Sequence, residues 1–447
     1  MKQAKLPLIL LFVLVGLGGL AYWDDQETAR EEKAEQTAKK LFPGITADEV
    51  SAVTVKLKDE EEIKLEKTSD WVVEQPVQAL ADSTLIETYL NTLLGISYEK
   101  ALSEGVKDLS VYGLKEPSLK VSFDSGEKSY TLSFGSKTPI GMARYARLEG
   151  DDRLLVTGSH NFKALNRKLF EFRDKTLGFS ELAETAQISL VRDEEILLER
   201  HDSEWKLVQN DDHFGVDQNF LDQFWSSLSG NKVVQFIDEP SAKLQEALKP
   251  ANSATELVAT LNWSTSGGES SSIQFLKHNE DVYAVNSSSN QTYRVQESLS
   301  DILLATTWDF RDKNVFDRDL SKLEKIQIDD DLYVKDQSSA WIKESEPEKA
   351  LDHIRYLVND IDFMQALNIL DDQAALKSLK KVNSATLVFS DEPNRVTLDF
   401  YQNNDNQVFV SVEGKQEYFE VEKENLENFS AKNVATSTEA KPGADKG

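Results

Sequence analysis

Apolar and polar residues alternate in short stretches along most of the chain. In the first group, apolar residues take every second position on either side of an acidic turn at 59–62, namely Val53, Val55, Leu57, Ile63 and Leu65. The group ends at Trp71 and Val73. A period of two is typical of strands with one buried face. The pattern therefore predicts a meander of short antiparallel strands.

The same order of alternating strands, acidic turn and tryptophan occurs three times. The turns at 193–195 and 329–331 precede Trp205 and Trp341 as the first turn precedes Trp71. The tryptophans are about 135 residues apart, and a fixed spacing of this kind is the signature of repeated structural units. Because each tryptophan stands in an alternating pattern, we expect it in a core rather than in a carbohydrate or peptide site.

A stretch with apolar residues at helical spacing follows each meander. The helices of the first two repeats are expected to begin at Asp82 or Ser83 and at Asp217, whose side chains are typical N-caps. In the third repeat, Ser345 and Glu348 have the spacing of a capping box. Further alternating stretches follow each helix, so every repeat is expected to combine antiparallel strands with a helix.

The first two repeats close on one phrase, Phe-Arg-Asp-Lys, whose residues are Phe172, Arg173, Asp174 and Lys175 in the first and Phe310, Arg311, Asp312 and Lys313 in the second. Two interpretations of its arginines stay open. Each arginine either contacts a partner or the next repeat, or forms an ion pair that holds the last helix of its own repeat. We favour the second interpretation. The third repeat ends near Phe429 without the phrase, as a terminal capping unit would.

These patterns predict an α+β fold of three tandem modules, each with an antiparallel strand meander, a helix and further hairpins. The predicted organisation is a cytoplasmic N-terminus at 1–5, a transmembrane anchor at 6–23, a helical stalk at 24–46, repeats at 47–180, 181–317 and 318–430, and a disordered tail at 431–447. The stalk is rich in helix formers without an apolar stripe, and the tail has no apolar run.

The N-terminal segment determines the predicted location. Two lysines precede the uncharged run at 6–23, and two aspartates follow it. A helix of this length spans about 27 Å, close to the roughly 30 Å of a bilayer's hydrocarbon core. The charges favour a cytoplasmic N-terminus, and hence a single-pass protein of the bacterial inner membrane with most of the chain in the periplasm. A cleaved signal peptide is the alternative, because Gly19 and Ala21 are small.

The charge and the lack of cysteine narrow the function. The chain carries 50 basic and 78 acidic residues, a net charge of −28 at pH 7. A surface this negative repels phosphate backbones, so nucleic-acid binding is disfavoured. There is no cysteine. This excludes disulfides, thiolate metal sites and a cysteine nucleophile, and it is compatible with the periplasm.

No motif identifies catalytic, cofactor or metal chemistry. None of the five histidines has the spacing of a helical zinc motif: His160, His201, His213, His278 and His353. The sequence has neither a Gly-x-Ser-x-Gly elbow nor a Gly-x-x-x-x-Gly-Lys phosphate loop. We therefore expect no enzyme activity, no cofactor and no metal, and we assign no catalytic residue. The marker residues, the three tryptophans and the Phe-Arg-Asp phrases, are structural.

At these residues the chain resembles a bacterial family described as domain of unknown function 4340. The likeness rests on Trp71-Val72-Val73, the helix start at Asp82, the Phe-Arg-Asp-Lys closings and a Gly-Leu-x-x-Pro turn at 113–117, and it covers about residues 47–430. The second repeat has Ala247 in place of the glycine. Members of that family look like membrane-anchored envelope proteins encoded beside ABC-2-type exporters and their auxiliary subunits. The resemblance implies an accessory role in export and supplies no catalytic residues.

The sequence thus predicts a non-enzymatic binding or scaffolding protein that assembles with an ABC-type permease, an auxiliary subunit or another envelope complex. Two alternatives remain. One is an envelope enzyme acting on glycan or peptide with acidic residues in a groove between modules, and the other is a receptor for a small ligand. A deep cleft with convergent buried carboxylates would favour the enzyme, and an enclosed pocket lined by aromatic residues would favour the receptor.

Overall fold

The structure, a computed structural model, describes residues 38–429 apart from gaps at 103–107, 249–254, 288, 290, 371–375, 393 and 416. The predicted cytoplasmic N-terminus, transmembrane anchor and tail lie outside the described residues, as do residues 24–37 of the predicted stalk. Among the residues that are described, no helix combines the length and the apolar character needed to cross a membrane.

The first repeat contains a nine-stranded antiparallel sheet with the strand order β4-β3-β2-β1-β6-β7-β8-β9-β5. Its strands are β1 (Val50–Leu57), β2 (Glu62–Lys67), β3 (Trp71–Gln75), β4 (Ala79–Leu80), β5 (Lys100–Leu102), β6 (Leu119–Ser125), β7 (Lys128–Lys137), β8 (Ala143–Leu148) and β9 (Leu154–Gly158). The strands β1 and β6 pair antiparallel, with Val55 opposite Val121. The sheet therefore consists of two meanders joined at this pair, with β5 added beside β9 at one edge.

The second sheet has the order β13-β12-β11-β10-β15-β16-β17-β18-β14, which matches the first strand for strand. Its strands are β10 (Thr185–Val191), β11 (Glu195–His201), β12 (Glu204–Gln209), β13 (Asp212–Gly215), β14 (Gln235–Phe236), β15 (Thr255–Thr265), β16 (Ser270–His278), β17 (Asp281–Asn286) and β18 (Gln291–Val295). Leu190 of β10 lies opposite Leu261 of β15, the counterpart of the β1–β6 pairing.

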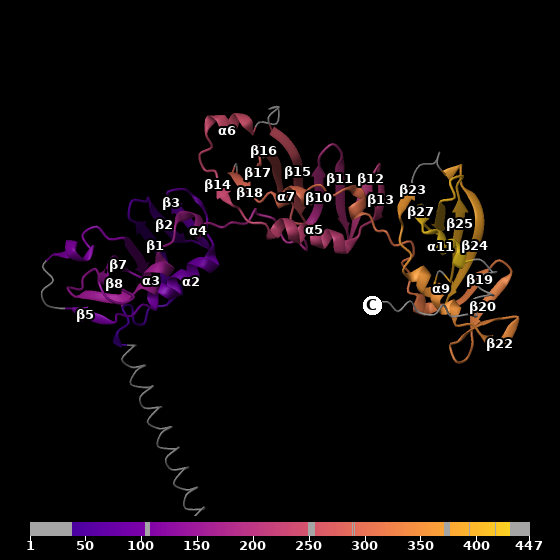
Figure 1. The fold of residues 1–447 in the computed structure, drawn as a ribbon, viewed down its shortest axis with the longest axis horizontal. Coiled ribbons are helices and arrows are strands. Elements are labelled where there is room, and N and C mark those ends of the chain that lie inside the picture. The colour runs from indigo at the N-terminus through magenta and orange to yellow at the C-terminus, as the bar shows by residue number, and fades with distance from the viewer. Residues whose placement is uncertain are drawn as a thin grey trace, which may run out of the picture. The chain divides into compact units, whose positions relative to one another are not determined.

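The third sheet repeats the order once more, as β22-β21-β20-β19-β24-β25-β26-β27-β23. Its strands are β19 (Leu323–Ile328), β20 (Asp331–Lys335), β21 (Trp341–Lys343), β22 (Glu346–Ala350), β23 (Asn368–Leu370), β24 (Lys380–Phe389), β25 (Arg395–Gln402), β26 (Val408–Val412) and β27 (Tyr418–Val421). The predicted α+β class is confirmed, and three sheets of one topology indicate three modules (Figure 1).

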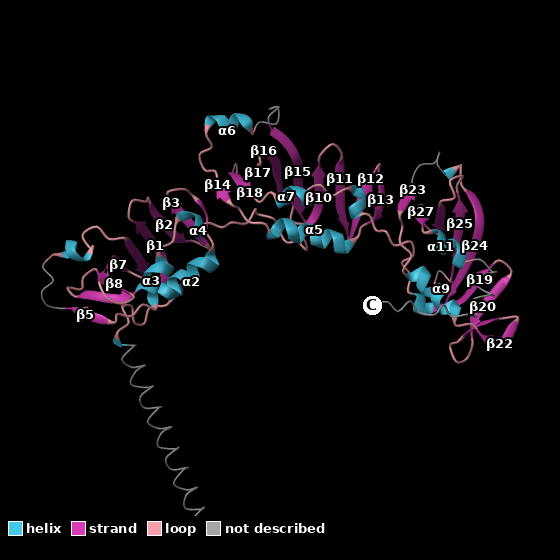
Figure 2. Ribbon diagram, in the orientation of Figure 1, coloured by secondary structure: helices cyan, strands magenta, loops and turns pink. Residues whose placement is uncertain are grey.

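The longest helix of each module follows the fourth strand of its sheet: α2 (Ser83–Leu94), α5 (Gln218–Gly230) and α9 (His353–Asp362). The shorter helices are α3 (Ser159–Leu165), α4 (Leu169–Phe172), α6 (Ala242–Ala247), α7 (Ser298–Ile302), α8 (Thr307–Phe310) and α11 (Lys423–Asn428). Single 3-10 turns are η1 (Ala47–Glu49), η2 (Leu109–Tyr112) and η3 (Leu320–Lys322). The helices account for a small part of the ribbon beside the strands (Figure 2).

The helix α2 covers one face of the first sheet. Val55 of β1 and Val121 of β6 are fully buried, and they form one core cluster with Ile86 and Leu90 of α2. Burial of every second strand residue removes apolar surface from water, at about 25 cal/mol per Å². The period of two that runs along these strands is thus the inward face of the sheet.

The tryptophan and turn predictions hold in all three modules. Trp71, Trp205 and Trp341 are 5%, 4% and 7% exposed, so each belongs to a core, as predicted. The acidic turns lie at the tips of the hairpins that connect β1 to β2, β10 to β11 and β19 to β20. Charged residues at such tips stay hydrated while the flanking apolar residues are buried.

Two helix starts are confirmed and the third is wrong. Asp82 accepts a hydrogen bond from the backbone N–H of Leu85 at 2.9 Å, and Asp217 accepts one from Phe220 at 3.0 Å. The predicted capping box of Ser345 and Glu348 does not form, because residues 346–350 are the edge strand β22, paired with β21. The strand pairing takes the backbone groups that a helix would use, and α9 begins only after Asp352.

The chain divides into two compact units. Among the described residues, one unit comprises 38–195 together with 224–304, and the other comprises 196–223 together with 305–429. Each site described below lies within a single unit.

Candidate functional sites

The Phe-Arg-Asp-Lys phrase forms the end of a short helix and the extended segment after it. Its phenylalanine is the last residue of α4 in the first repeat and of α8 in the second, and both are buried. Arg173 forms an isolated antiparallel bridge with Ala81, and Arg311 forms one with Val216. The phrase therefore lies beside the residues that precede α2 or α5, and this backbone role is the same in both repeats.

Arg173 is buried against residues of the second repeat. Its side chain is 3% exposed, its Cζ lies 3.6 Å from the ring centroid of Phe236, and its Nη1 donates to both carboxylate oxygens of Asp238 at 2.8 and 2.7 Å. Phe236 also contacts the ring of Phe170 in α4. The interpretation that we favoured, a tie within the first repeat, is wrong for this arginine. It contacts the next repeat, inside one compact unit.

Arg311 is equally buried, and its contacts are shared between two repeats. Its Cζ lies 3.6 Å from the ring centroid of Phe214 in β13, and it donates to Gln209 Oε1 at 3.0 Å. Its Nη2 also lies 3.7 Å from a carboxylate oxygen of Glu417, in the third repeat. Arg311 therefore fastens its own repeat and also contacts the next one.

The aspartates of the phrase stabilise the turn that follows. Asp174 accepts hydrogen bonds from the backbone and the hydroxyl of Thr176, at 2.9 and 2.7 Å. Asp312 accepts one from the backbone N–H of Asn314 at 2.9 Å. The adjacent arginine and aspartate thus have separate roles, because the arginine pairs elsewhere.

A pocket adjoins each buried arginine. The pocket beside Arg173 has a volume of about 210 Å³ and is lined by Phe236 and Tyr293 among others. Burial raises the pKa of the Tyr293 hydroxyl above its usual range. The pocket beside Arg311 has a volume of about 390 Å³, and the charged side chains that line it include Lys206, Asp212, Asp312, Asp317, Lys415 and Glu417. The larger pocket offers groups of both signs for ion pairing.

The helix α9 exposes apolar side chains on its outer side. Tyr356 is 69% exposed and Phe363, seven residues later at the helix end, is 75% exposed. Leu367 follows at 51% exposed. Residues seven apart lie on one side of a helix. We call Tyr356 and Phe363, together with Leu367 in the segment between α9 and β23, the α9 apolar surface.

The corresponding positions of the first module are polar or small. When Ile86 of α2 is aligned with Ile354 of α9, both of which are fully buried, the three apolar positions fall on Thr88, Gly95 and Glu99. All three of these residues are exposed. The first module therefore shows that the shared fold does not require apolar side chains at these positions.

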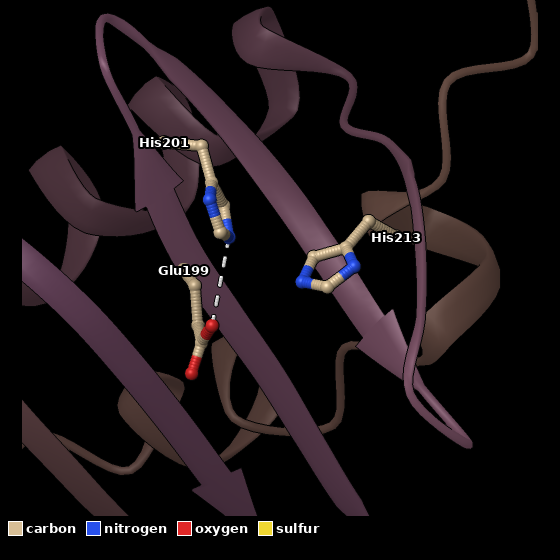
Figure 3. A group of neighbouring side chains, drawn as sticks. All are labelled: Glu199, His201 and His213. Atoms are coloured by element: carbon tan, nitrogen blue, oxygen red, sulfur yellow. Dashed lines mark ion pairs between the residues drawn. The ribbon is translucent and has the colours of Figure 1, made fainter.

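A group of metal-ligating side chains lies on the exposed side of the second sheet. Glu199 and His201 come from β11 and His213 comes from β13, and one ligand atom from each lies within 4.8 Å of the others. The imidazole Nε2 of His201 is 3.6 Å from Glu199 Oε2, and the two imidazole rings have centroids 4.8 Å apart (Figure 3). We call these three residues the Glu-His-His group.

Alternation and two hairpins bring this group together. Glu199 and His201 are two residues apart, so their side chains lie on the same face of β11, while Leu198, the residue before Glu199, is buried on the other face. The residues Asn210 and Asp211 connect β12 to β13, and both have positive φ, at 49° and 69°. Two central residues with positive φ are characteristic of a type I′ hairpin turn.

The Glu-His-His group was not predicted from the sequence, because its histidines do not have the spacing of a helical zinc motif. The signal that was present is Glu-x-His in a stretch predicted to be a strand, followed by a third ligand two hairpins later. An Asn-Asp pair at a turn is a recognisable hairpin signal, but the sequence does not show how far the third strand reaches. The distance between the ligands is a property of the folded sheet.

Comparison with known proteins gives a match to a family model over less than half of the chain. The family model described as "Domain of unknown function (DUF4340)" matches residues 71–252. This confirms the resemblance for residues 71–252, which are part of the range 47–430 over which it was predicted. The match runs from β3 of the first sheet to the residues just before β15 of the second, so it spans the first Phe-Arg-Asp-Lys phrase. No curated protein and no solved structure gave a significant match.

Proposed function

We propose that this protein is a non-enzymatic, membrane-anchored scaffold of the bacterial periplasm, an accessory component of an ABC-type exporter or another envelope complex. The α9 apolar surface is the observation that carries the proposal. Three modules share one topology, yet the third exposes two aromatic rings and a leucine where the first has polar or small residues.

Exposed aromatic residues grouped on one helix are typical of protein interaction sites. Hydration of Tyr356, Phe363 and Leu367 costs free energy that burial against a partner would recover, at about 25 cal/mol per Å². Aromatic anchors dominate the energetics of many interfaces. The acidic character of the chain disfavours anionic lipid or nucleic acid as the occupant, so the partner of this surface is a protein.

The test is cross-linking mass spectrometry of the full-length chain in native membranes, wild type against Tyr356→Ser/Phe363→Ser. We expect cross-links from the third module to a permease or auxiliary subunit, and we expect the double variant to lose most of them. The matched control is Ile140→Ser/Met142→Ser, because these residues are 90% and 81% exposed on the first module. It removes a similar apolar area elsewhere. Equal cross-linking by all three proteins, or self-links only, would refute the role of α9.

A second function is a receptor for a small charged ligand in the 390 Å³ pocket beside Arg311, whose lining is mostly charged and polar rather than the aromatic lining expected from the sequence. Its volume lies within the range of about 300–1,000 Å³ that is usual for ligand sites. Its lining of lysine and carboxylate side chains fits a ligand that carries both charges. Native mass spectrometry of the full chain purified from membranes tests this. A retained small molecule would add a fixed mass to the protein, and Lys415→Ala should lower the fraction of protein that carries this mass.

A further inference from the structure

We propose that Glu199, His201 and His213 form a binding site for a divalent first-row transition-metal ion of the zinc class. The three side chains offer two imidazole nitrogens and one carboxylate oxygen. This donor set suits zinc and its neighbours, whereas calcium and magnesium take oxygen ligands alone. The proposal is independent of the scaffold function proposed above, because it concerns a different module and a different surface.

The distances require only small side-chain movements. Zinc–ligand bonds of about 2.0–2.1 Å place neighbouring ligand atoms of a tetrahedral site roughly 3.3 Å apart. The His201 Nε2 to Glu199 Oε2 distance is already 3.6 Å, and the ligand atoms of all three residues lie within 4.8 Å of one another. Figure 3 shows the His213 ring facing the other two side chains. Rotation of exposed imidazoles closes the remaining gap without backbone change.

The strands that carry the ligands are held by the sheet. β12 lies between β11 and β13 and pairs with both, with His201 opposite Glu204 and Val208 opposite His213. Leu198 and Leu207, on the opposite face, are buried. A ligand set on paired strands loses little backbone entropy when a metal ion binds.

The exposure of the group determines what kind of site it is. His201 and His213 are exposed and Glu199 is partly buried, so water completes the coordination and the ion exchanges with solvent. β13 is the terminal strand of its sheet and is four residues long. A bound ion would tie β13 to β11 across β12. His213 also lines the 390 Å³ pocket beside Arg311, so the ion would stabilise one wall of that pocket.

The test is titration calorimetry of the full-length chain in detergent with Zn²⁺, without a polyhistidine tag and in excess Mg²⁺. Magnesium occupies the many surface carboxylates that would otherwise hold zinc weakly. We expect one saturable equivalent of zinc in the wild type. His201→Ala and His213→Ala should each weaken binding about tenfold or more, because each removes one of three protein ligands. Exposed residues of this kind can be replaced without unfolding the sheet, which circular dichroism verifies.

The matched control is His160→Ala, since His160 is an exposed histidine on α3 of the first module. It should bind zinc as the wild type does. A Co²⁺ titration adds a second readout, because imidazole ligation at a four-coordinate site gives visible absorption bands that carboxylate binding does not. The proposal is overturned if the wild type shows no saturable equivalent, or if the double variant His201→Ala/His213→Ala binds as tightly as the wild type.

Discussion

The first and second repeats use the same closing phrase with the same backbone and with different side-chain partners. Asp82 N–H donates to the Phe172 carbonyl at 2.8 Å, and Asp217 N–H donates to the Phe310 carbonyl at 2.9 Å. Both arginines stack at 3.6 Å on a phenylalanine. The ring comes from β14 of the next sheet in the first case and from β13 of the same sheet in the second.

The charge partners differ as well. Arg173 donates to a carboxylate oxygen at 2.7 Å, whereas Arg311 donates to the neutral amide of Gln209 at 3.0 Å, and the Glu417 carboxylate lies farther from it, at 3.7 Å. A repeated phrase therefore preserves what the backbone and the buried phenylalanine do, while the long arginine side chain adapts to whichever aromatic ring is near. The shared phrase therefore predicts the local backbone contacts of each repeat, but it does not predict the distant side-chain partners of the arginine.

The largest effect on stability is expected at the buried phenylalanines, which have the same role in both repeats. Phe172→Ala and Phe310→Ala should each lower the free energy of unfolding of their repeat by about 3–5 kcal/mol, because each removes a fully buried ring. Phe172 contacts Tyr89, and Phe310 contacts Phe220, at ring distances of 5.1 and 5.0 Å. Urea denaturation of the full-length chain followed by tryptophan fluorescence measures this. A loss below about 1 kcal/mol in only one repeat would contradict the equivalence of the two phrases.

Because the charge partners of the two arginines differ, the carboxylates of Asp238 and Glu417 should contribute unequally to stability. Asp238→Ala should cost about 2–4 kcal/mol, because it leaves the buried Arg173 guanidinium without its ionic partner. Glu417→Ala should cost less than about 1 kcal/mol, since Arg311 keeps its hydrogen bond to Gln209. The same denaturation experiment compares them.

The control for this asymmetry is Arg173→Met. Methionine keeps the contact with Phe236, and the freed Asp238 is 36% exposed and can be hydrated. The cost should therefore be smaller than that of Asp238→Ala, at about 1 kcal/mol. A larger loss of stability in Arg173→Met than in Asp238→Ala would contradict this explanation. It would show that the unpaired buried charge of Arg173 is not the main cause of the destabilisation.

A smaller effect is expected at the Gly-Leu-x-x-Pro turn, where the repeats also differ. Gly113 has φ of +68°, and an added Cβ would lie 2.9 Å from the backbone nitrogen of Ser136. Gly113→Ala should cost about 1–3 kcal/mol. Ala247, at the same place in the second repeat, is instead the last residue of the helix α6. Ala247→Gly should therefore destabilise by about 0.5–1 kcal/mol, and a stabilisation would show that this site also needs positive φ.

Much of the fold could be predicted because each strand has one buried face. Val53 and Val55, like Ile326 and Ile328, are buried and stand two residues apart. Because every second residue of a strand lies on the same face, this spacing in the sequence predicts both the strand and its buried face. The capping box at Ser345 and Glu348 failed for the opposite reason. A local helix signal was overridden by the pairing of β22 with β21, and that pairing depends on the rest of the third sheet.

The sites could be predicted less well because they combine distant residues. Arg173 and Asp238 are 65 positions apart, and no local pattern links them. His213 meets Glu199 only through the β12 hairpins, whose lengths set the distance. The α9 apolar surface was hidden for another reason. Helical spacing places Ile354, Leu357 and Ile361 on the buried side of α9, but the sequence does not show whether another part of the chain covers Tyr356 and Phe363.

The smallest predicted effect concerns the helix starts, where the first two repeats agree and the third differs. Asp82→Ala and Asp217→Ala should each cost about 1 kcal/mol, because each removes a hydrogen bond to an otherwise unpaired N–H in the first turn. Asp352→Ala should change stability very little, since Asp352 has helical dihedral angles and makes no side-chain cap. Hydrogen exchange at the first turns of α2, α5 and α9 in the full chain resolves effects of this size. Faster exchange in α9 on replacing Asp352, equal to that in α2 on replacing Asp82, would show that the third repeat starts its helix as the other two do.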